Sequence, residues 1–388
     1  MRDRPSRDRP SAPRSRGRAE PTRKPSALPR ATKVAERPAA GIETSPRVPI
    51  PSGKPLLGPW LLTTRPGAET DLVEELALAK IDARVRGGAL VESRALPTFE
   101  DGSIDATFAR QGFRLRATLS GDATTLARSL ADRTASLAPK DRALAISVFA
   151  PDTDDANRLA SLAEEIESLA SAHLAARRVV PLASAARESA LVVQGAMLSA
   201  TELAFGDVSA EHLLSPFRGG KARMSVAADS PSRASRKVEE ALNWLGVSPG
   251  AADTCVDLGA APGGWSWALL DKRCRVIAVD PAELREDVRD HPKLRHEQVS
   301  AFGYAPPDPA DWLFCDMAWR PVEVARMLAK WARRGYARML VSNVKLPMKQ
   351  KALIVREVRE VVHGGGWKDV RTRQLYHDRD EITLTARR

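Results

Sequence analysis

A short glycine-rich stretch has the residue types and spacing of a ligand-binding turn. It reads Asp257-Leu-Gly-Ala-Ala-Pro-Gly-Gly-Trp265, follows the apolar, β-prone run 254–258, and leads into a helix. Glycines at such a turn let the backbone approach a ligand and present N–H groups near the positive end of a helix. A second β-prone run ends in Asp280, 21 residues after Gly259, where an acid can hold the ribose hydroxyls of a nucleotide-like cofactor.

This turn differs from the dinucleotide-binding pattern G-x-G-x-x-G. It lacks a glycine two residues after Gly259 and carries Pro262 inside the turn. A cofactor with an adenosine and a short charged tail therefore fits better than a pyrophosphate, and S-adenosylmethionine meets that description. An ordinary tight turn of any α/β enzyme is the alternative. The candidate cofactor-binding residues of the turn are Gly259, Ala261, Pro262, Gly263, Gly264 and Trp265, together with Asp280.

Four charged residues form a candidate catalytic set. They are Lys237, Asp316, Lys345 and Glu381. Asp316 and Lys345 end two β-prone runs, and ligands of open α/β sheets bind beyond the carboxyl ends of the strands. Methyl transfer to a hydroxyl requires an oxygen that loses its proton and is aligned with the donor. We interpret Lys345 as the group that takes this proton or steers it away.

For that role we expect the pKa of Lys345 to be lowered by burial and by the like charge of Lys237. Asp316 and Glu381 would orient the ammonium groups and limit this lowering. Each residue alone has a simpler alternative, a strand-end charge that reaches solvent or a weak surface ion pair.

Strand and helix patterns alternate over residues 215–388, which predicts a Rossmann-like, mainly parallel sheet with a terminal antiparallel hairpin. The predicted strands are Thr254–Leu258, Arg275–Asp280, Asp311–Asp316, Arg338–Lys345, Val370–Tyr376 and Ile382–Ala386. The predicted helices begin at Pro231 and Trp265 and cover Pro321–Arg334 and Gln350–Val362.

Residues 60–214 predict an α+β region without a recognisable catalytic set. Its expected strands are Trp60–Thr64, Ala89–Ser93, Phe113–Leu119, Leu144–Phe149, Ala190–Leu198 and Ser199–Phe205, and its expected helices are Glu69–Lys80 and Asp154–Ala176. The pattern suits a ferredoxin-like unit joined to a second small α/β subdomain that grips RNA. A packing or dimerisation domain is the alternative.

Residues 1–59 are rich in Arg, Pro and Ser and poor in bulky apolar residues, so we expect a disordered basic tail. Residues 1–55 hold 14 Lys/Arg against 5 Asp/Glu, which accounts for nine of the eleven net positive charges of the chain. Such a tail suits a sequence-independent RNA-binding arm or a solubilising extension.

Composition excludes several other classes of protein. The sequence has no run of eighteen apolar residues, so it predicts no membrane span. It has no apolar stretch behind its first charges, so it predicts no secretory signal. Cys255, Cys274 and Cys315 are scattered and odd in number, so we expect buried free thiols in a cytoplasmic protein. No Cys/His spacing predicts a metal site.

The C-terminal half resembles the FtsJ-like family of RNA 2′-O-ribose methyltransferases. Within it the chain is similar to the RlmM type, which modifies a cytidine of bacterial 23S ribosomal RNA. The matching stretches are Pro231-Ser-Arg233, Lys237-Val-Glu-Glu-Ala241, Asp257–Trp265, Cys315-Asp-Met317, Asn343-Val-Lys-Leu-Pro-Met-Lys349 and Arg373-Gln-Leu-Tyr-His-Asp-Arg-Asp-Glu381. Weaker matches at Leu61–Gly67, Phe108–Phe113 and Ser215–Phe217 extend the similarity, and imply that the N-terminal part is a THUMP-containing RNA-binding region.

The resemblance implies that Ala261–Gly264, Asp280 and Asp316 contact S-adenosylmethionine and that Lys345 is the proton acceptor. Two departures stand out: Ser300 where the family has an acid facing the adenine, and Ala234, followed by Ser235, where it has a cofactor-contacting serine. The implied partner is 23S RNA, protein-free or in an early assembly intermediate, and we expect a monomer that binds neither membrane nor metal.

Two other functions remain open. An RNA-binding ribosome-assembly protein with a methyltransferase fold would be inactive or act on another RNA. A base or small-molecule methyltransferase is the second alternative. Base-amine enzymes, however, carry an Asn-Pro-Pro-Tyr-like motif where this chain has Asp316-Met-Ala-Trp319.

Overall fold

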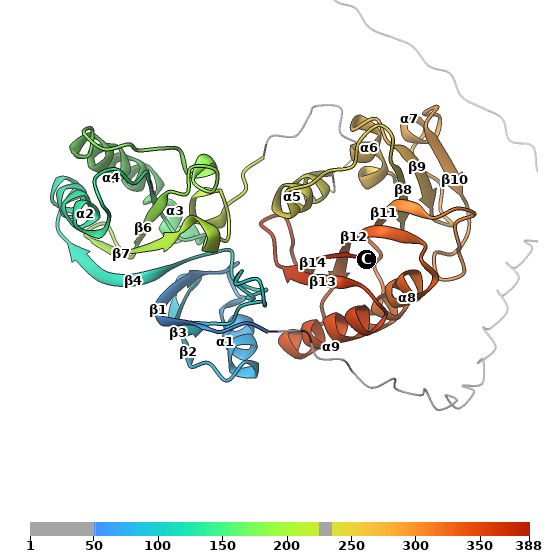
Figure 1. The fold of residues 1–388 in the computed structure, drawn as a ribbon, viewed down its shortest axis with the longest axis horizontal. Helices are drawn as coiled ribbons and strands as arrows, with labels where there is room; N and C mark the ends of the chain where they lie inside the picture. Colours follow the sequence, from blue (N-terminus) through green and yellow to red (C-terminus); the bar gives the residue numbers. More distant parts are fainter. Residues whose placement is uncertain (1–49, 51, 225–234) are drawn as a thin grey trace, which may run out of the picture. The chain divides into compact units, whose positions relative to one another are not determined.

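The computed structural model describes residues 50, 52–224 and 235–388, and the strands of these residues form two seven-stranded sheets (Figure 1). Most of the predicted disordered tail, residues 1–49 and 51, lies outside the described residues, as do Pro231–Ala234. The prediction is wrong at the end of the tail, because residues 56–59 belong to the first strand, which begins at Leu56. The described residues belong to one compact unit. No helix of the described residues is long and apolar enough to cross a membrane.

The C-terminal sheet has the order β10-β9-β8-β11-β12-β14-β13. Its strands are β8 (Thr254–Leu258), β9 (Arg275–Val279), β10 (Leu294–Glu297), β11 (Ala310–Cys315), β12 (Ala337–Lys345), β13 (Lys368–Arg373) and β14 (Glu381–Arg387). The first five pair in parallel, and β14 pairs antiparallel with both β12 and β13. The expected parallel sheet with a terminal antiparallel hairpin is confirmed, and the carboxyl ends of β8, β9, β11 and β12 meet at one edge.

Helices pack against this sheet through apolar faces. They are α5 (Ser235–Leu245), α6 (Gly264–Asp271), the short α7 (Glu286–Arg289), α8 (Pro321–Arg334) and α9 (Lys351–Gly364). Figure 1 shows α5 next to α6 and α8 beside α9, and both pairs are in contact. The bounds of α8 agree with the prediction because both ends carry clear signals, Pro321 in the first turn and Gly335 in the left-handed conformation after the last.

The N-terminal sheet has the order β2-β3-β1-β4-β7-β6-β5. Its strands are β1 (Leu56–Thr63), β2 (Ala83–Gly87), β3 (Leu90–Leu96), β4 (Gln111–Ser120), β5 (Leu144–Phe149), β6 (Leu191–Met197) and β7 (Glu202–Ser209). Its helices are α1 (Glu69–Leu78), α2 (Ala123–Leu137), α3 (Asp154–Asn157) and α4 (Ala160–His173). The strand β2 and the helix α2 were not expected. The helix predicted over Asp154–Ala176 is interrupted at residues 158–159 and ends at His173.

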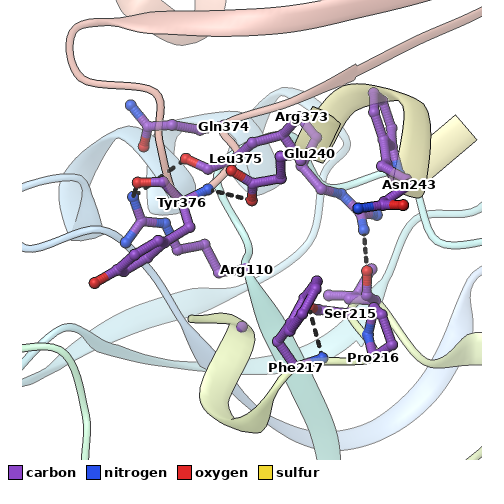
Figure 2. Close-up of a pocket in the computed structure, with 13 residues that line it drawn as sticks. Arg110, Ser215, Pro216, Phe217, Glu240, Asn243, Arg373, Gln374, Leu375 and Tyr376 are labelled. Carbon is purple, nitrogen blue, oxygen red and sulfur yellow. Dashed lines mark hydrogen bonds between the residues drawn. The ribbon is translucent and has the colours of Figure 1, made fainter. Parts of the chain in front are cut away.

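The end of β13 and the loop between β13 and β14 are held by Thr107 and Arg110, which lie in the connection between β3 and β4. Thr107 bonds the side chain of Thr372 at 2.8 Å, and its carbonyl accepts a bond from the Gln374 amide at 2.7 Å. The guanidinium of Arg110 donates to the carbonyls of Leu375 and Tyr376, both at 3.3 Å (Figure 2). This loop leads directly to β14, so these contacts help to fix the strand that begins with Glu381.

Candidate active site

The four candidate catalytic residues lie together at the carboxyl edge of the C-terminal sheet. Glu381 pairs opposite Lys345 in the β12–β14 ladder, and Asp316 directly follows β11. Lys237 comes from the first turn of α5. Each lysine contacts both acids: Lys237 bonds Glu381 and lies 3.8 Å from Asp316, while Lys345 bonds Glu381 and lies 3.5 Å from Asp316. The result is a closed ring of two cations and two anions, which we call the Lys–Asp ring.

Burial differs around the Lys–Asp ring. The side chain of Glu381 is 4% exposed, whereas that of Lys345 is 36% exposed. Burial raises the pKa of Glu381, but the two lysines outweigh this effect and hold the pKa below its ordinary value. Glu381 is therefore an anion at neutral pH that forms an ion pair with each of the two lysines, and Asp316 supplies the second negative charge of the ring.

The expected lowering of the pKa of Lys345 is wrong. Burial does lower this pKa, but Asp316 and Glu381 oppose it more strongly and raise the pKa above its ordinary value. The physical reason is distance, because both carboxylates lie at hydrogen-bond or ion-pair range of Nζ. Lys345 is an ammonium in this state of the protein.

The glycine turn lies beside the Lys–Asp ring. Gly259 adopts a φ of 76°, and a Cβ at this position would lie 2.7 Å from Cγ of Met317, so only glycine fits between the turn and the loop that follows β11. Gly263, with a φ of 111°, is the N-cap of α6, whose first N–H groups lack acceptors within the helix. The Asp280 carboxylate accepts the Ala261 amide at 3.1 Å, which ties the turn to the tip of β9.

Asp257, at the end of β8, is fully buried below the turn. Its Oδ2 accepts a bond from the Ser266 hydroxyl at 2.7 Å, whereas its Oδ1 has no hydrogen-bond partner among the described residues. Burial raises the pKa of this carboxyl to about 7. Asp257 thus joins β8 to α6 and stiffens the turn from beneath.

A cavity of about 710 Å³ opens above the Lys–Asp ring. Its wall includes Lys237, Lys345 and Glu381 from the ring and continues along the loop between β13 and β14. The volume falls within the range of about 300–1,000 Å³ that is usual for ligand sites. The edge of the sheet therefore combines a charged ring, a glycine turn and a cavity large enough for a ligand.

Comparisons with known proteins agree with this geometry. The model of the FtsJ-like methyltransferase family matches residues 231–335. Ribosomal RNA large subunit methyltransferase M of Alkalilimnicola ehrlichii is 34% identical over 364 residues, which cover 84% of this chain and 94% of that protein. The protein of that name from Laribacter hongkongensis is 32% identical over 361 residues, 84% of this chain and 95% of that protein. This chain belongs to the ribosomal RNA large subunit methyltransferase M family.

Another relative of the same name, from Teredinibacter turnerae, is 42% identical over 178 residues, which cover 42% of this chain and 50% of that protein. The family relationship and the observed sheet agree that residues 235–388 form an α/β methyltransferase fold.

The donor set of the site suits the cofactor of such a fold. Oδ1 of Asp316 is buried and faces Nζ of Lys345 at 3.5 Å without forming a hydrogen bond with the described residues, so it can accept one from the amino group of an amino-acid tail. The Asp280 carboxylate, at the tip of β9, can accept from ribose hydroxyls. Within the described residues, no group of His, Cys, Asp and Glu is arranged to hold a metal ion.

For three of the predicted cofactor-binding residues, the side chain is not seen to face the proposed cofactor site. The Trp265 side chain packs edge-on against Phe314 in the core, with ring centroids 6.2 Å apart, so a contact with cofactor from this residue has to come from its backbone. Ser300 lies exposed in the loop after β10. Ser235 is buried at the start of α5, two residues before Lys237.

Sequence reasoning missed one element of the site, the pair of Glu240 and His377. The carboxylate of Glu240 lies 2.6 Å from Nδ1 of His377, and both side chains are largely buried. Both residues stand inside the stretches that carry the family resemblance, but 137 positions separate them. Only the fold brings them together.

Proposed function

We propose that this protein uses S-adenosylmethionine to methylate the 2′-hydroxyl of a cytidine in 23S ribosomal RNA. The observation that carries the proposal is the Lys–Asp ring at the carboxyl edge, directly beside the glycine turn and open to a large cavity. The names of the relatives support the substrate class, because they describe methyltransferases of the large ribosomal subunit RNA. In this proposal residues 60–214 bind RNA in the manner of a THUMP-containing region, and residues 215–388 carry out the reaction.

The glycine turn and Asp280 would hold the adenosine, and Asp316 the amino-acid tail. When bound, S-adenosylmethionine supplies an electrophilic methyl group on a positively charged sulfur. Lys345 starts as an ammonium because two carboxylates face it. The positive charge that bound S-adenosylmethionine would bring beside Asp316 would compete with Lys345 for that carboxylate and lower the pKa of Lys345. Its partly exposed Nζ can then release a proton to solvent and accept the one that leaves the ribose hydroxyl.

Lys237 and Glu381 have a positioning role in this scheme. Glu381 bonds both lysines and fixes the distance between their Nζ atoms, while Lys237 leaves the two acids with one paired positive charge when Lys345 loses its proton. A fixed arrangement matters because methyl transfer needs the attacking oxygen in line with the donor. The exposed wall of the cavity receives the nucleotide, and the buried side of the ring excludes water.

The test uses the purified full-length chain, tritiated S-adenosylmethionine and 23S RNA from a strain that lacks the gene, followed by nucleoside mass spectrometry. A single 2′-O-methylcytidine is the expected product. Label on another nucleotide would keep the chemistry and reject the target. Absence of label despite cofactor binding would favour an RNA-binding assembly protein.

Substitution of Lys345 by alanine tests the proton acceptor. Lys345→Ala should abolish methylation and leave binding of S-adenosylmethionine measurable by calorimetry. The matched control is Lys368→Ala, which removes an exposed lysine at the opposite end of the sheet, where β13 begins. Full activity of Lys345→Ala would reject the assigned role.

A further inference from the structure

The helix α5 contributes a second buried contact to the site, one turn after Lys237. The carboxylate of Glu240 accepts the backbone amide of Tyr376 at 2.7 Å (Figure 2). It accepts the backbone amide of His377 at 2.9 Å. It also meets Nδ1 of His377 at 2.6 Å. Because residues three apart share one face of a helix, the face of α5 that brings Lys237 to the ring also holds the loop between β13 and β14.

The contact with Glu240 decides which nitrogen of His377 carries the proton. An ionised carboxylate only accepts hydrogen bonds, so Nδ1 has to be the donor. In the neutral imidazole, Nε2 is then an acceptor. The side chain of His377 is 12% exposed and that of Glu240 is 7% exposed, so the ring is held in one orientation rather than moving in solvent.

His377 is one of the residues that line the 710 Å³ cavity, together with Lys237 and Lys345. The wall contains six lysines and arginines but only four acids, and three of those acids form ion pairs with lysines or arginines of the same wall. Such a wall attracts a polyanion. A nucleotide whose ribose reaches Lys345 therefore has to pass close to His377.

We propose that His377 is a substrate-binding residue, and that Nε2 accepts a hydrogen bond from a hydroxyl or amine of the target ribonucleotide. Glu240 is the positioning residue that sets the tautomer and the angle of the ring. This inference rests on the proposed function, because it assigns the cavity to RNA. It adds a residue that recognises the nucleotide without touching the transferred proton.

Two conservative substitutions separate this role from a purely structural one. In His377→Asn the amide can replace Nδ1 and keep the bond to Glu240, but nothing occupies the position of Nε2. In His377→Gln the amide reaches the position of Nε2 and leaves that of Nδ1 empty. A residue that only fastens the loop should tolerate Asn better, whereas a residue that binds the nucleotide should tolerate Gln better.

The experiment measures KM and kcat of the full-length protein on unmethylated 23S RNA transcript, together with the Kd of S-adenosylmethionine. Loss of one hydrogen bond made equally in the ground and transition states raises KM and leaves kcat unchanged. We expect His377→Asn to raise the KM for RNA about tenfold, with an unchanged cofactor Kd and melting temperature. His377→Gln should stay within about threefold of the wild type.

The opposite order, with Gln impaired and Asn normal, would overturn the inference, and so would two variants with wild-type KM. The proposed function fails separately, if the wild type does not methylate the transcript. In that case the Kd of the transcript for the same variants decides the inference, because binding at His377 needs no methyl transfer.

Discussion

Replacement of Glu381 by glutamine removes one negative charge from between Lys237 and Lys345 and keeps the volume of the side chain. Glu381 helps to raise the pKa of Lys345, so its neutralisation should let Lys345 lose its proton at a lower pH. If Lys345 accepts the proton of the ribose hydroxyl, the rising limb of the pH–rate profile follows the neutral amine. That limb should therefore move toward lower pH in Glu381→Gln, even if the maximal rate falls.

The size of the shift follows from the contact between Lys345 and Glu381. Two unit charges about 4 Å apart interact by about 4 kcal/mol at an effective dielectric constant of about 20. At about 1.4 kcal/mol per pH unit this corresponds to about three pH units. Because the Lys345 side chain is 36% exposed, water screens part of the interaction, and we expect a shift of about one to two pH units.

The assay is a single-turnover rate measured from pH 6 to pH 10 with saturating RNA and cofactor, since chemistry then limits the rate. Asp369→Asn, which neutralises an acid paired with Arg387 near the other end of the hairpin, is the matched control and should leave the profile unchanged. An unmoved limb in an active Glu381→Gln variant would refute the reasoning. Either Lys345 is not the proton acceptor, or Glu381 does not set its proton affinity.

Three further predictions concern Asp280, Asp257 and the ion pair of Arg359 with Asp105. Asp280→Asn should weaken S-adenosylmethionine about tenfold in calorimetry, because an amide is a poorer acceptor for ribose hydroxyls; an unchanged Kd would exclude Asp280 from the cofactor site. Asp257, with a pKa of about 7 when folded, keeps its proton while the unfolded chain loses one above about pH 4, so stability should fall as pH rises to 7 and then level off. Urea unfolding at pH 5 and pH 7 measures this fall in the free energy of unfolding, which should be about 2–3 kcal/mol smaller in Asp257→Asn than in the wild type. An equal fall in both proteins would contradict the raised pKa. Arg359→Met breaks the two-bond pair with Asp105 (2.7 and 2.9 Å) and should lower the free energy of unfolding by about 3–5 kcal/mol, most of which the double variant with Asp105→Leu should recover.

The C-terminal sheet could be predicted from the sequence because its signals are local. Short apolar runs ended in Asp280, Asp316 and Lys345, and the carboxyl ends of parallel strands meet at one edge. This geometry predicts that Asp316 and Lys345 lie together, whereas Lys237 and Glu381 join them through α5 and the antiparallel strand β14. All four lie together in the structure, although their roles remain predictions.

The proton affinity of Lys345 could not be predicted in the same way. Its sign depends on whether burial or two neighbouring carboxylates dominate, which is a question of ångströms. The sequence shows that Asp316 and Glu381 belong to the same edge but not that both lie at contact distance from Nζ. The contact between Glu240 and His377 is hidden for the same reason, since no local pattern connects a helix face with a loop so distant in the chain.

The two elements of the N-terminal region that were not predicted, α2 and β2, have different explanations. The helix α2 begins at a clear N-cap, where Asp122 accepts the Thr125 amide at 2.8 Å, and its buried residues Leu126 and Leu130 stand at helical spacing, so the sequence carried a helix signal that the prediction did not use. The strand β2 is mostly exposed and carries two arginines, so it shows no alternation of buried and exposed residues. Its pairing with β3, rather than its own composition, makes it a strand.

The position of β14 has a consequence for when this protein becomes active. β14 lies between β12 and β13, so it must be inserted before the sheet is complete, and its first residue, Glu381, closes the Lys–Asp ring. A nascent chain or proteolytic fragment that stops short of Glu381 lacks both β14, which joins β13 to the rest of the sheet, and the anion that bonds the two lysines. Methylation should therefore switch on in one step, as the sheet closes, and its onset during refolding measures the completion of the fold.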